Sequence, residues 1–335
     1  MNKIQDKILI TGAAGFMGLH LARRLLKDGY KVDLVDNLAR GVHDIELQGV
    51  LDQWSTANFF NIDCLNSSNT QQLSNDYSYI FNMAAIIGVE HVMKRPYRVI
   101  VDNLNLLDNL IEVARRQKNL RRFFYPSTSE VTAGTLEYFE LPIPTPEDVH
   151  LAITDLKRPR TSYMLSKIAG ECLCHYSDIP YTIFRPHNVY GPRMGLAHVV
   201  PGQLEKAFNA KDGETVLVAS IDQTRCFCYV DDAIEQLIRM MNTPLALGET
   251  LNLGTEKPEA TILEVAKLCH SAVGRKVIIQ EEASPSGSPK RRGPDMSHAF
   301  HITGYESQVS LEEGIQRTYK WYLDNIFSGQ MLSAK

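Results

Sequence analysis

A glycine-rich turn follows directly on an apolar run near the start of the chain. The run Lys7–Thr11 is aliphatic and β-branched, and Gly12, Gly15 and Gly18 lead from it into an amphipathic stretch over 16–28. Glycine is needed where the backbone turns sharply or where a ligand approaches main-chain N–H groups. A strand, a tight turn and a helix start in this order predict an anion-binding helix N-terminus.

The alternation of short apolar runs with amphipathic stretches continues to about residue 185. We expect further strands at Val32–Val35, Asn58–Ile62, Tyr79–Asn82, Arg122–Pro126 and Tyr181–Arg185, and helices over Pro96–Gln117 and Ser162–Tyr176. Alternating strands and helices imply a parallel sheet that is covered by helices on both faces. The predicted fold class is therefore α/β, a Rossmann-type doubly wound parallel sheet with a smaller C-terminal α/β substrate-binding domain.

An acidic residue closes the second expected strand, 18 residues after the last glycine of the turn. Asp36 at this position can accept the ribose hydroxyls of a dinucleotide and repels a 2′-phosphate, which favours NAD over NADP. Two residues separate Gly12 from Gly15, whereas the general fingerprint has one, and Arg40 weakens the preference for NAD. The alternative is that these glycines merely cap a turn.

The sequence pattern changes after Arg185, where the expected elements become shorter and Gly and Pro become more frequent. We predict an NAD-binding Rossmann domain over residues 1–185, to which a segment near 225–250 returns, and a mainly substrate-binding domain over 186–330. Sites in open α/β sheets form at the carboxyl ends of the strands. The crevice between the two domains is therefore the expected site.

Composition excludes several other kinds of protein. The net charge of −4 over 335 residues argues against a nucleic-acid or membrane-surface partner, because both attract clusters of Lys and Arg. The polar start of the chain and the lack of a long apolar stretch predict a cytoplasmic protein. Six scattered cysteines without CxxC spacing predict neither disulfides nor a metal site.

Tyr163 and Lys167 stand four residues apart in an expected helix, on one face. An ammonium group near a phenol, together with the positive nicotinamide of NAD, favours the phenolate and is expected to lower the pKa of Tyr163 toward neutrality. Tyr163 could then take the proton of a substrate hydroxyl. A Tyr and a Lys at this spacing are common by chance, so other motifs must support the assignment.

The order of the motifs resembles that of the extended short-chain dehydrogenase/reductase family. The glycine turn is followed by Asn82–Ala85, then by Ser127–Glu130, and then by Tyr163 and Lys167. The resemblance implies that Thr128 bonds the reacting hydroxyl, that Tyr163 is the base and that Lys167 holds the nicotinamide ribose. It implies NAD contacts at Gly12, Gly15, Phe16, Met17, Gly18, Asp36, Asn37, Asp63, Ala84, Ala85, Asn103, Tyr163 and Lys167.

The second half resembles the members of that family that act on sugar nucleotides. Segments around Asn188, Arg225 and Arg292 are similar to those that hold the nucleotide and its two phosphates, and arginine suits phosphate because its planar fork bonds two oxygens. A solvated basic loop is the alternative for Lys290–Arg292. The implied contacts with a UDP- or GDP-linked sugar are Ser129, Arg160, Asn188, Val200, Arg225 and Arg292.

Oxidation of a hexose or heptose at C4 gives a ketone that can be epimerised, dehydrated or decarboxylated. By the resemblance, Glu130 is a fourth catalytic residue, because dehydratases and UDP-glucuronate decarboxylases have an acid there and galactose-type epimerases do not. The second half is most similar to the decarboxylases, but Thr132 and Ala133 replace the usual Tyr-Gly. A decarboxylase, a 4-dehydrogenase that stops at the 4-keto sugar and a non-catalytic NAD-binding regulator all stay open.

Two expected helices carry apolar residues over a wide arc. Such a helix is either deeply buried or part of an interface. The resemblance implies a homodimer through the helices near 96–117 and 162–176.

Overall fold

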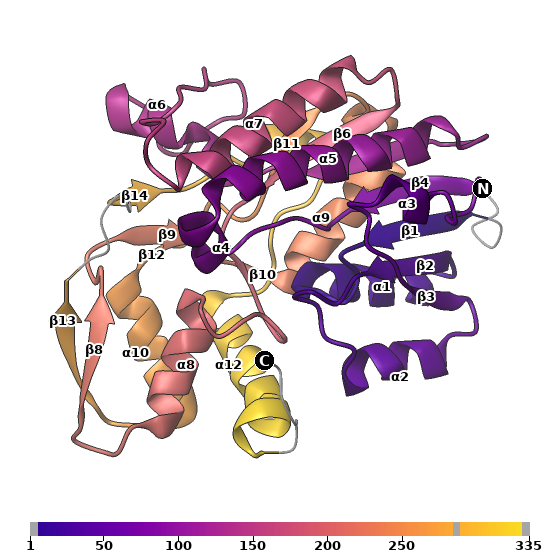
Figure 1. Cartoon of the computed structure of the whole chain (residues 1–335). Coiled ribbons are helices and arrows are strands. Elements are labelled where there is room, and N and C mark those ends of the chain that lie inside the picture. The colour runs from indigo at the N-terminus through magenta and orange to yellow at the C-terminus, as the bar shows by residue number, and fades with distance from the viewer. Residues whose placement is uncertain (1–5, 284–288, 330–335) are drawn as a thin grey trace.

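The computed structural model describes residues 6–283 and 289–329. Its largest sheet has seven strands in the order β11-β6-β5-β4-β1-β2-β3, and all neighbours in it are parallel (Figure 1). The strands of this sheet are β1 (Lys7–Thr11), β2 (Lys31–Asp36), β3 (Ala57–Asn61), β4 (Tyr77–Asn82), β5 (Arg122–Pro126), β6 (Tyr181–Pro186) and β11 (Thr250–Leu253). The predicted α/β fold class with a doubly wound parallel sheet is confirmed.

The helices alternate with these strands and then continue into the second half of the chain. They are α1 (Phe16–Lys27), α2 (Ile45–Gln53), α3 (Ser67–Thr70), α4 (Val89–Lys94), α5 (Pro96–Arg115), α6 (Ala133–Tyr138), α7 (Thr161–Tyr176), α8 (Val199–Asn209), α9 (Val230–Asn242), α10 (Ile262–Val273), α11 (Ser297–Thr303) and α12 (Leu311–Tyr322). Among the described residues, no helix combines the length and apolarity needed to cross a bilayer.

Two hydrophobic cores lie on opposite faces of the large sheet. Successive side chains of a strand point to opposite faces, so Ile8 and Ile10 of β1 join one core while Leu9 between them joins the other. Helices α1 and α9 supply the first core, and α5 supplies much of the second. All three strand residues are completely buried. The continuous apolar runs of the sequence reflect this coverage on both faces.

The second half forms smaller sheets and a group of helices beside the large sheet (Figure 1). One sheet pairs β8 with β13, another pairs β7 with β10, and a third has the order β12-β9-β14. Their bounds are β7 (Val189–Tyr190), β8 (Thr215–Ala219), β9 (Thr224–Cys226), β10 (Cys228–Tyr229), β12 (Glu259–Thr261), β13 (Ile278–Glu282) and β14 (Arg291–Arg292). Between them, α9 packs on α1 and β11 pairs with β6, so this part of the chain lies against the large sheet.

Candidate active site

The glycine turn joins β1 to α1 with no space for larger residues. Gly12 has φ +66°, and a Cβ atom there would lie 2.7 Å from the backbone of Met83 and Ala84. A Cβ on Gly18 would lie 2.3 Å from the carbonyl oxygen of Gly12. Gly15 caps α1 without a side chain, and the first turn of the helix, which begins with Phe16 and Met17, contains no acid. These features fit the pyrophosphate of a dinucleotide, which favours helix N–H groups free of competing negative charge.

Asp36 holds the turn from the end of β2. Its Oδ2 accepts from the N–H of Ala14 at 3.0 Å and its Oδ1 accepts from the N–H of Leu38 at 2.8 Å. Burial raises the pKa of Asp36 above its usual value, and the two N–H donors oppose that rise. Asn37 beside it is exposed, with its Oδ1 accepting from the N–H of Ala39. The Asp36 carboxylate thus orders the loop on which an adenosine would rest.

The loop after β4 is fixed by α5. Asn103 accepts from the N–H of Ile86 at 2.8 Å and donates to its carbonyl at 3.1 Å and to Ser166 of α7 at 3.2 Å. The N–H of Ala84 points to Thr11 Oγ1 at 3.4 Å, and Ala85 follows in the same loop. Asp63, beyond β3, accepts from the N–H of Leu65. Direct contact of these residues with NAD stays a prediction, but each orders a segment around the glycine turn.

The predicted trio meets at the carboxyl end of β5. Thr128 follows this strand, and its hydroxyl hydrogen-bonds the hydroxyl of Tyr163 and accepts from the N–H of Glu130 at 3.3 Å. The Lys167 ammonium lies one helical turn from Tyr163, with Nζ 5.8 Å from the Tyr163 ring centroid. It donates to the carbonyl of Pro126 at 2.7 Å. The structure therefore brings the three side chains together as expected.

The expected fall of the Tyr163 pKa, which includes the charge of bound NAD, does not occur in the protein by itself. Burial raises the pKa of Tyr163 above its usual value, and the negative charge of Glu130 adds to the rise. The hydrogen bond from Thr128 and the charge of Arg40 act the other way but are weaker. Burial also lowers the pKa of Lys167 to about 8. Desolvation was not visible in the spacing of Tyr163 and Lys167, and it is the largest contribution here.

A buried ion pair joins the strands and the helix that carry the trio. Arg185 of β6 donates to both carboxylate oxygens of Glu171 on α7, at 2.9 and 2.8 Å, and both side chains are more than nine-tenths buried. Ser127 of the same turn as Thr128 donates to Glu171 as well. The bidentate geometry suits an arginine and a carboxylate. It joins β5, β6 and α7 at the point where the trio converges.

Glu130 stands between Tyr163 and two arginines. Its Oε1 lies 4.0 Å from Arg160 at the start of α7. Arg292 is near enough for the Glu130 charge to raise its pKa, although burial has the larger effect and lowers it. The Nε of Arg292 has no hydrogen-bond partner among the described residues and no contact with solvent. This corner of the site can therefore bind an anionic or polar group.

Arg225 and Arg292 lie side by side on the parallel strands β9 and β14. Arg225 is buried and donates to the carbonyls of Thr224 and Pro289, at 2.7 and 2.8 Å. Burial, and then the charge of Arg292, lower the pKa of Arg225 to about 10. Two neighbouring guanidinium groups in one site are unfavourable without an anion, so the pair suits a phosphate.

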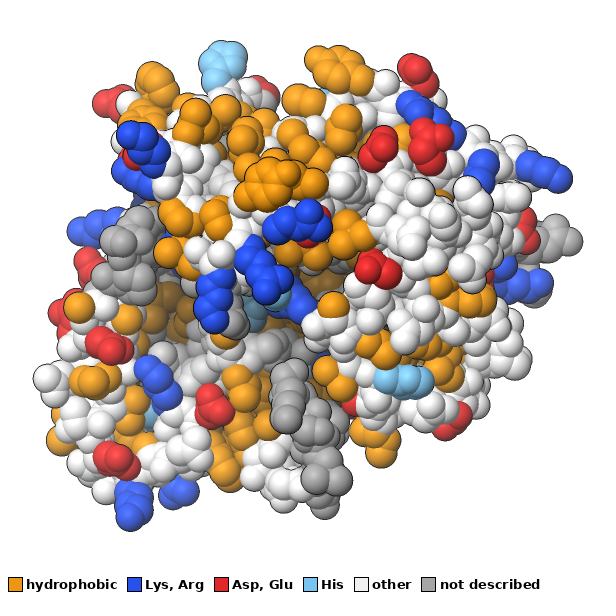
Figure 2. Space-filling model, viewed as in Figure 1, with side chains coloured by type: hydrophobic (Ala, Val, Ile, Leu, Met, Phe, Trp, Pro, Cys, Tyr) orange, Lys and Arg blue, Asp and Glu red, His pale blue; other side chains and the backbone are white. Residues whose placement is uncertain are grey.

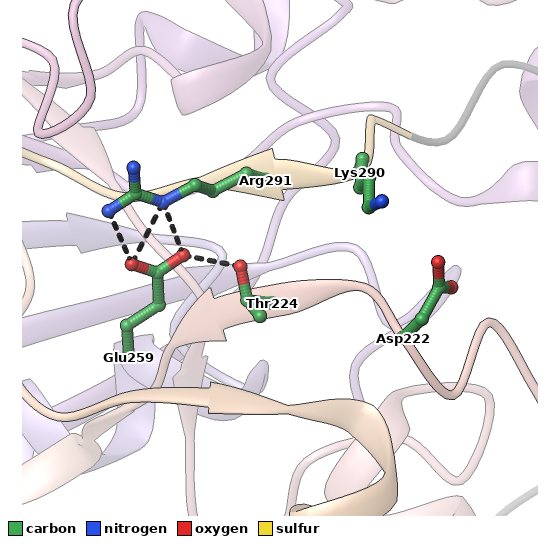
Figure 3. Close-up of a pocket in the computed structure, with 5 residues that line it drawn as sticks. All are labelled: Asp222, Thr224, Glu259, Lys290 and Arg291. Carbon is green, nitrogen blue, oxygen red and sulfur yellow. Dashed lines mark hydrogen bonds and ion pairs between the residues drawn. The ribbon is translucent and has the colours of Figure 1, made fainter.

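Arg291 points away from this pair. Strand β14 alternates its side chains, so Arg291 faces a surface pocket lined by Asp222, Thr224, Glu259 and Lys290 (Figure 3). There it forms a bidentate ion pair with Glu259, with contacts of 2.7 Å from both Nε and Nη2. The alternative that Lys290–Arg292 is a solvated basic loop thus fits Arg291, which lies at the surface. It does not fit Arg292, which faces the site.

The remaining predicted substrate residues are Asn188, Ser129 and Val200. Asn188 has φ +41° and donates to the carbonyl of Cys226 at 3.2 Å. The side chains of Ser129 and Val200 are buried, and Val200 belongs to the large hydrophobic core. Any contact of Val200 with a ligand must therefore use its backbone. Ligand contacts of all three residues stay predictions.

Arg40 entered the sequence reasoning only through the choice between NAD and NADP, but the structure places its charge near Tyr163. It extends from the loop after β2 so that its charge acts on Tyr163 and on His198, and a Cβ on Gly88 would lie 3.9 Å from its guanidinium. Figure 2 shows Lys and Arg side chains gathered near the middle of the same face as in Figure 1. The signal in the sequence was an arginine four residues after Asp36. Across 6–283 and 289–329 no group of three or more His, Cys, Asp or Glu residues is arranged to hold a metal.

Comparison with known proteins agrees with this geometry. The model of the "NAD dependent epimerase/dehydratase family" matches residues 8–254. A UDP-N-acetyl-alpha-D-glucosaminuronate decarboxylase of Bacillus cytotoxicus is 32% identical over 334 residues, covering 95% of this chain and 98% of that protein. UDP-glucuronic acid decarboxylase 1 of Danio rerio is 30% identical, covering 96% of this chain and 73% of that protein.

A solved structure extends the similarity to three dimensions. UDP-glucuronic acid 4-epimerase from Bacillus cereus, in complex with UDP-glucuronic acid and NAD, superposes with a TM-score of 0.80 at 28% identity, covering 95% of this chain and 99% of that one. Together with the glycine turn and the Thr128, Tyr163 and Lys167 constellation, these similarities identify the family. The chain is an enzyme of the NAD-dependent epimerase/dehydratase family, within the extended short-chain dehydrogenases/reductases.

Proposed function

We propose that this enzyme oxidises a UDP-linked uronic acid at C4 of the sugar ring and that the 4-keto acid then loses carbon dioxide. The observation that carries the proposal is the cluster at the end of β5, where Thr128 and Tyr163 meet Glu130 beside Arg160 and Arg292. The first pair can hold a secondary alcohol and take its hydroxyl proton, while the hydride would go to NAD. Arg160 can receive a carboxylate, and Arg292 a phosphate.

Residues of the glycine turn and of the neighbouring loops would hold the cofactor. Gly12, Gly15 and the first turn of α1 suit the pyrophosphate, Asp36 the adenosine ribose, and Tyr163 with Lys167 the nicotinamide end. When bound, NAD supplies a positive charge and an acceptor for the C4 hydrogen with its electron pair, which it can later return. A positive charge there opposes the effect of burial on the pKa of Tyr163.

Tyr163 takes the proton of the C4 hydroxyl while Thr128 holds the same oxygen. The Thr128 oxygen accepts from the N–H of Glu130, and the proton that Thr128 gives to Tyr163 in the free protein can turn to the substrate oxygen. Lys167 places an ammonium group next to Tyr163 and is kept in position by the carbonyl of Pro126. Loss of the O–H and C–H bonds at C4 forms the ketone.

A ketone at C4 makes a carboxylate on C5 a β-keto acid. The bond between C5 and its carboxylate can then break, its electron pair moves toward the C4 oxygen, carbon dioxide leaves and C5 takes a proton. Support for a uronic acid comes from Arg160 beside Glu130 and from relatives whose names specify UDP-linked uronic acids. Arg225 and Arg292 in register on β9 and β14 suit the diphosphate.

The test is incubation with a panel of UDP-glucuronate, UDP-N-acetylglucosaminuronate, UDP-glucose and GDP-mannose, followed by mass spectrometry. We expect loss of carbon dioxide from one of the two uronates. No change in mass with a changed sugar stereochemistry would assign epimerisation, and loss of water would assign dehydration. The Tyr163→Phe protein is the matched control, and product formation by it would contradict the proposed role of Tyr163.

We also propose which part of the chain binds each ligand. Residues 1–185, with the segment near 225–250, bind NAD, and 186–330 mainly bind the sugar nucleotide.

We propose further that the protein is a homodimer through α5 and α7. The two helices pack on each other and carry apolar side chains that stay partly or largely exposed, namely Tyr97, Ile100, Leu104, Leu165, Ile168, Leu173 and Tyr176. Sedimentation analysis of the protein and of a Leu104→Glu variant tests this assembly.

A further inference from the structure

A buried arginine connects the second half of the chain to the cofactor loop. Arg193 follows the Gly191-Pro192 turn at φ +69°, and its side chain is only 8% exposed. Its Nη1 donates to the carbonyls of Ala14 at 2.7 Å and Gly15 at 3.0 Å. These are the two residues immediately before the start of α1. An arginine from beyond β6 thus fixes the backbone of the glycine turn.

The same guanidinium fixes a second segment. Its Nη2 donates to the carbonyl of Val42 at 2.8 Å, and its Nε donates to Asp44 Oδ2 at 2.8 Å. Asp44 is also buried, and its other oxygen accepts from the N–H of Leu47 to cap α2. Val42 and Asp44 belong to the loop that follows Asp36. One planar side chain therefore joins the two loops on which a dinucleotide would lie.

The turn that carries Arg193 is itself held from two sides. The His20 Nε2 of α1 donates to the carbonyl of Pro192 at 3.1 Å. The hydroxyl of Tyr322, at the end of α12, donates to the carbonyl of Met194. Arg193 is thus anchored at its backbone as well as at its guanidinium.

We propose that Arg193 is a positioning residue for NAD, which keeps the glycine turn and the loop of residues 37–44 in the arrangement that binds the dinucleotide. Its fixed fork matches several carbonyls at once, which the single ammonium of a lysine cannot do. Its positive charge behind the turn also favours the pyrophosphate. The inference needs only the NAD dependence of the family and is independent of the sugar substrate.

The test compares NAD content after purification and the dissociation constant of NADH, measured by fluorescence, in wild type, Arg193→Lys and Asp44→Asn. We expect NADH affinity to fall about tenfold or more in Arg193→Lys, as loss of hydrogen bonds made by a charged group implies. Asp44→Asn should weaken it in the same direction. Turnover at saturating NAD should stay near the wild-type value, because the contacts of Thr128 and Tyr163 are unchanged.

A matched control separates positioning from general stability. Arg122 is also buried and donates to backbone carbonyls, those of Met240 and Thr243, but it lies at the opposite end of β5 from the site. Arg122→Lys should lower the unfolding temperature and leave NADH affinity unchanged. The proposal is overturned if Arg193→Lys behaves like Arg122→Lys, or if it lowers turnover at saturating NAD while NADH binds normally.

Discussion

The Lys167 ammonium lies beside Tyr163 without bonding it: Nζ is 5.8 Å from the ring centroid and donates to the Pro126 carbonyl instead. Lys167 is buried and Tyr163 is partly buried, and desolvation shifts both pKa values toward the neutral forms. The pKa values of Tyr163 and Lys167 should therefore shift when a charged ligand binds beside them. In the protein alone, desolvation is the largest contribution to both shifts.

The burial of Lys167 predicts a specific dependence of stability on pH. Burial lowers the pKa of Lys167 to about 8 in the folded chain, whereas an unfolded lysine has a pKa of about 10.4. Between these values the unfolded state binds more protons, so the free energy of unfolding contributed by Lys167 rises with pH. Denaturant unfolding should show this rise in wild type and not in Lys167→Met. Parallel curves for the two proteins from pH 7 to about 10 would contradict the assignment.

Gly12 should tolerate no side chain. In Gly12→Ala, the new methyl group meets the backbone of Met83 and Ala84 at 2.7 Å in addition to the strain of a positive φ. Gly29→Ala is the control, because Gly29 has φ +91° but nothing within 4 Å of its Cβ position. We expect Gly29→Ala to cost only about 1 to 2 kcal/mol in unfolding free energy, and Gly12→Ala to lose bound NAD as well. Normal NAD content in Gly12→Ala would contradict this, because it would show that the loop of Met83 and Ala84 can move aside.

Removing only one charge of the ion pair between Arg185 and Glu171 should strongly lower the free energy of unfolding. Glu171→Gln leaves a buried guanidinium without its counter-charge, and such changes cost about 3 to 5 kcal/mol. The double variant Arg185→Met/Glu171→Leu removes both charges and should be more stable than Glu171→Gln. Chemical denaturation of the three proteins measures this order. If Glu171→Gln were the more stable variant, the pair would not be a significant contributor to the fold.

Arg292 should matter more for ligand binding than for folding. Arg292 is paired with Arg225 on the neighbouring strand, and the two positive charges repel each other. Arg292→Met removes this repulsion, so its unfolding temperature should be equal to that of wild type or higher. The same change should abolish calorimetric binding of UDP. Arg291→Met is the control, since Arg291 points outward to Glu259 and should affect UDP binding little. Equal UDP affinity in both variants would remove the diphosphate assignment.

Much of the large sheet was predictable because its signals are local. The apolar run of β1, the glycines after it and the amphipathic α1 are consecutive in sequence, and the expected and observed bounds differ by a residue or so. Helix α5 ends at Arg115, and Gln117 instead uses its side chain to bond the carbonyls of Val113 and Ser74. Tyr163 and Lys167 were found because one helix carries both.

The features that were not predictable depend on distant parts of the chain. The pKa of Tyr163 is set by burial beneath other elements, which the spacing to Lys167 does not report. Arg193 lies more than 170 residues from the glycine turn it holds, and its sequence neighbours give no sign of this contact. The position of Arg225 beside Arg292 likewise depends on the pairing of β9 with β14.

The most direct test of the account is the absorbance of reduced nicotinamide after rapid mixing of the NAD-loaded enzyme with UDP-glucuronate or UDP-N-acetylglucosaminuronate. With wild type, the account predicts a transient rise for the uronate that is turned over, followed by a decay as the hydride returns to C4 of the decarboxylated sugar. Tyr163→Phe should bind the same sugar nucleotide and show no such rise, because it lacks the group that removes the C4 hydroxyl proton. A normal rise in Tyr163→Phe, or carbon dioxide release by wild type without any rise, would contradict oxidation at C4 by Tyr163.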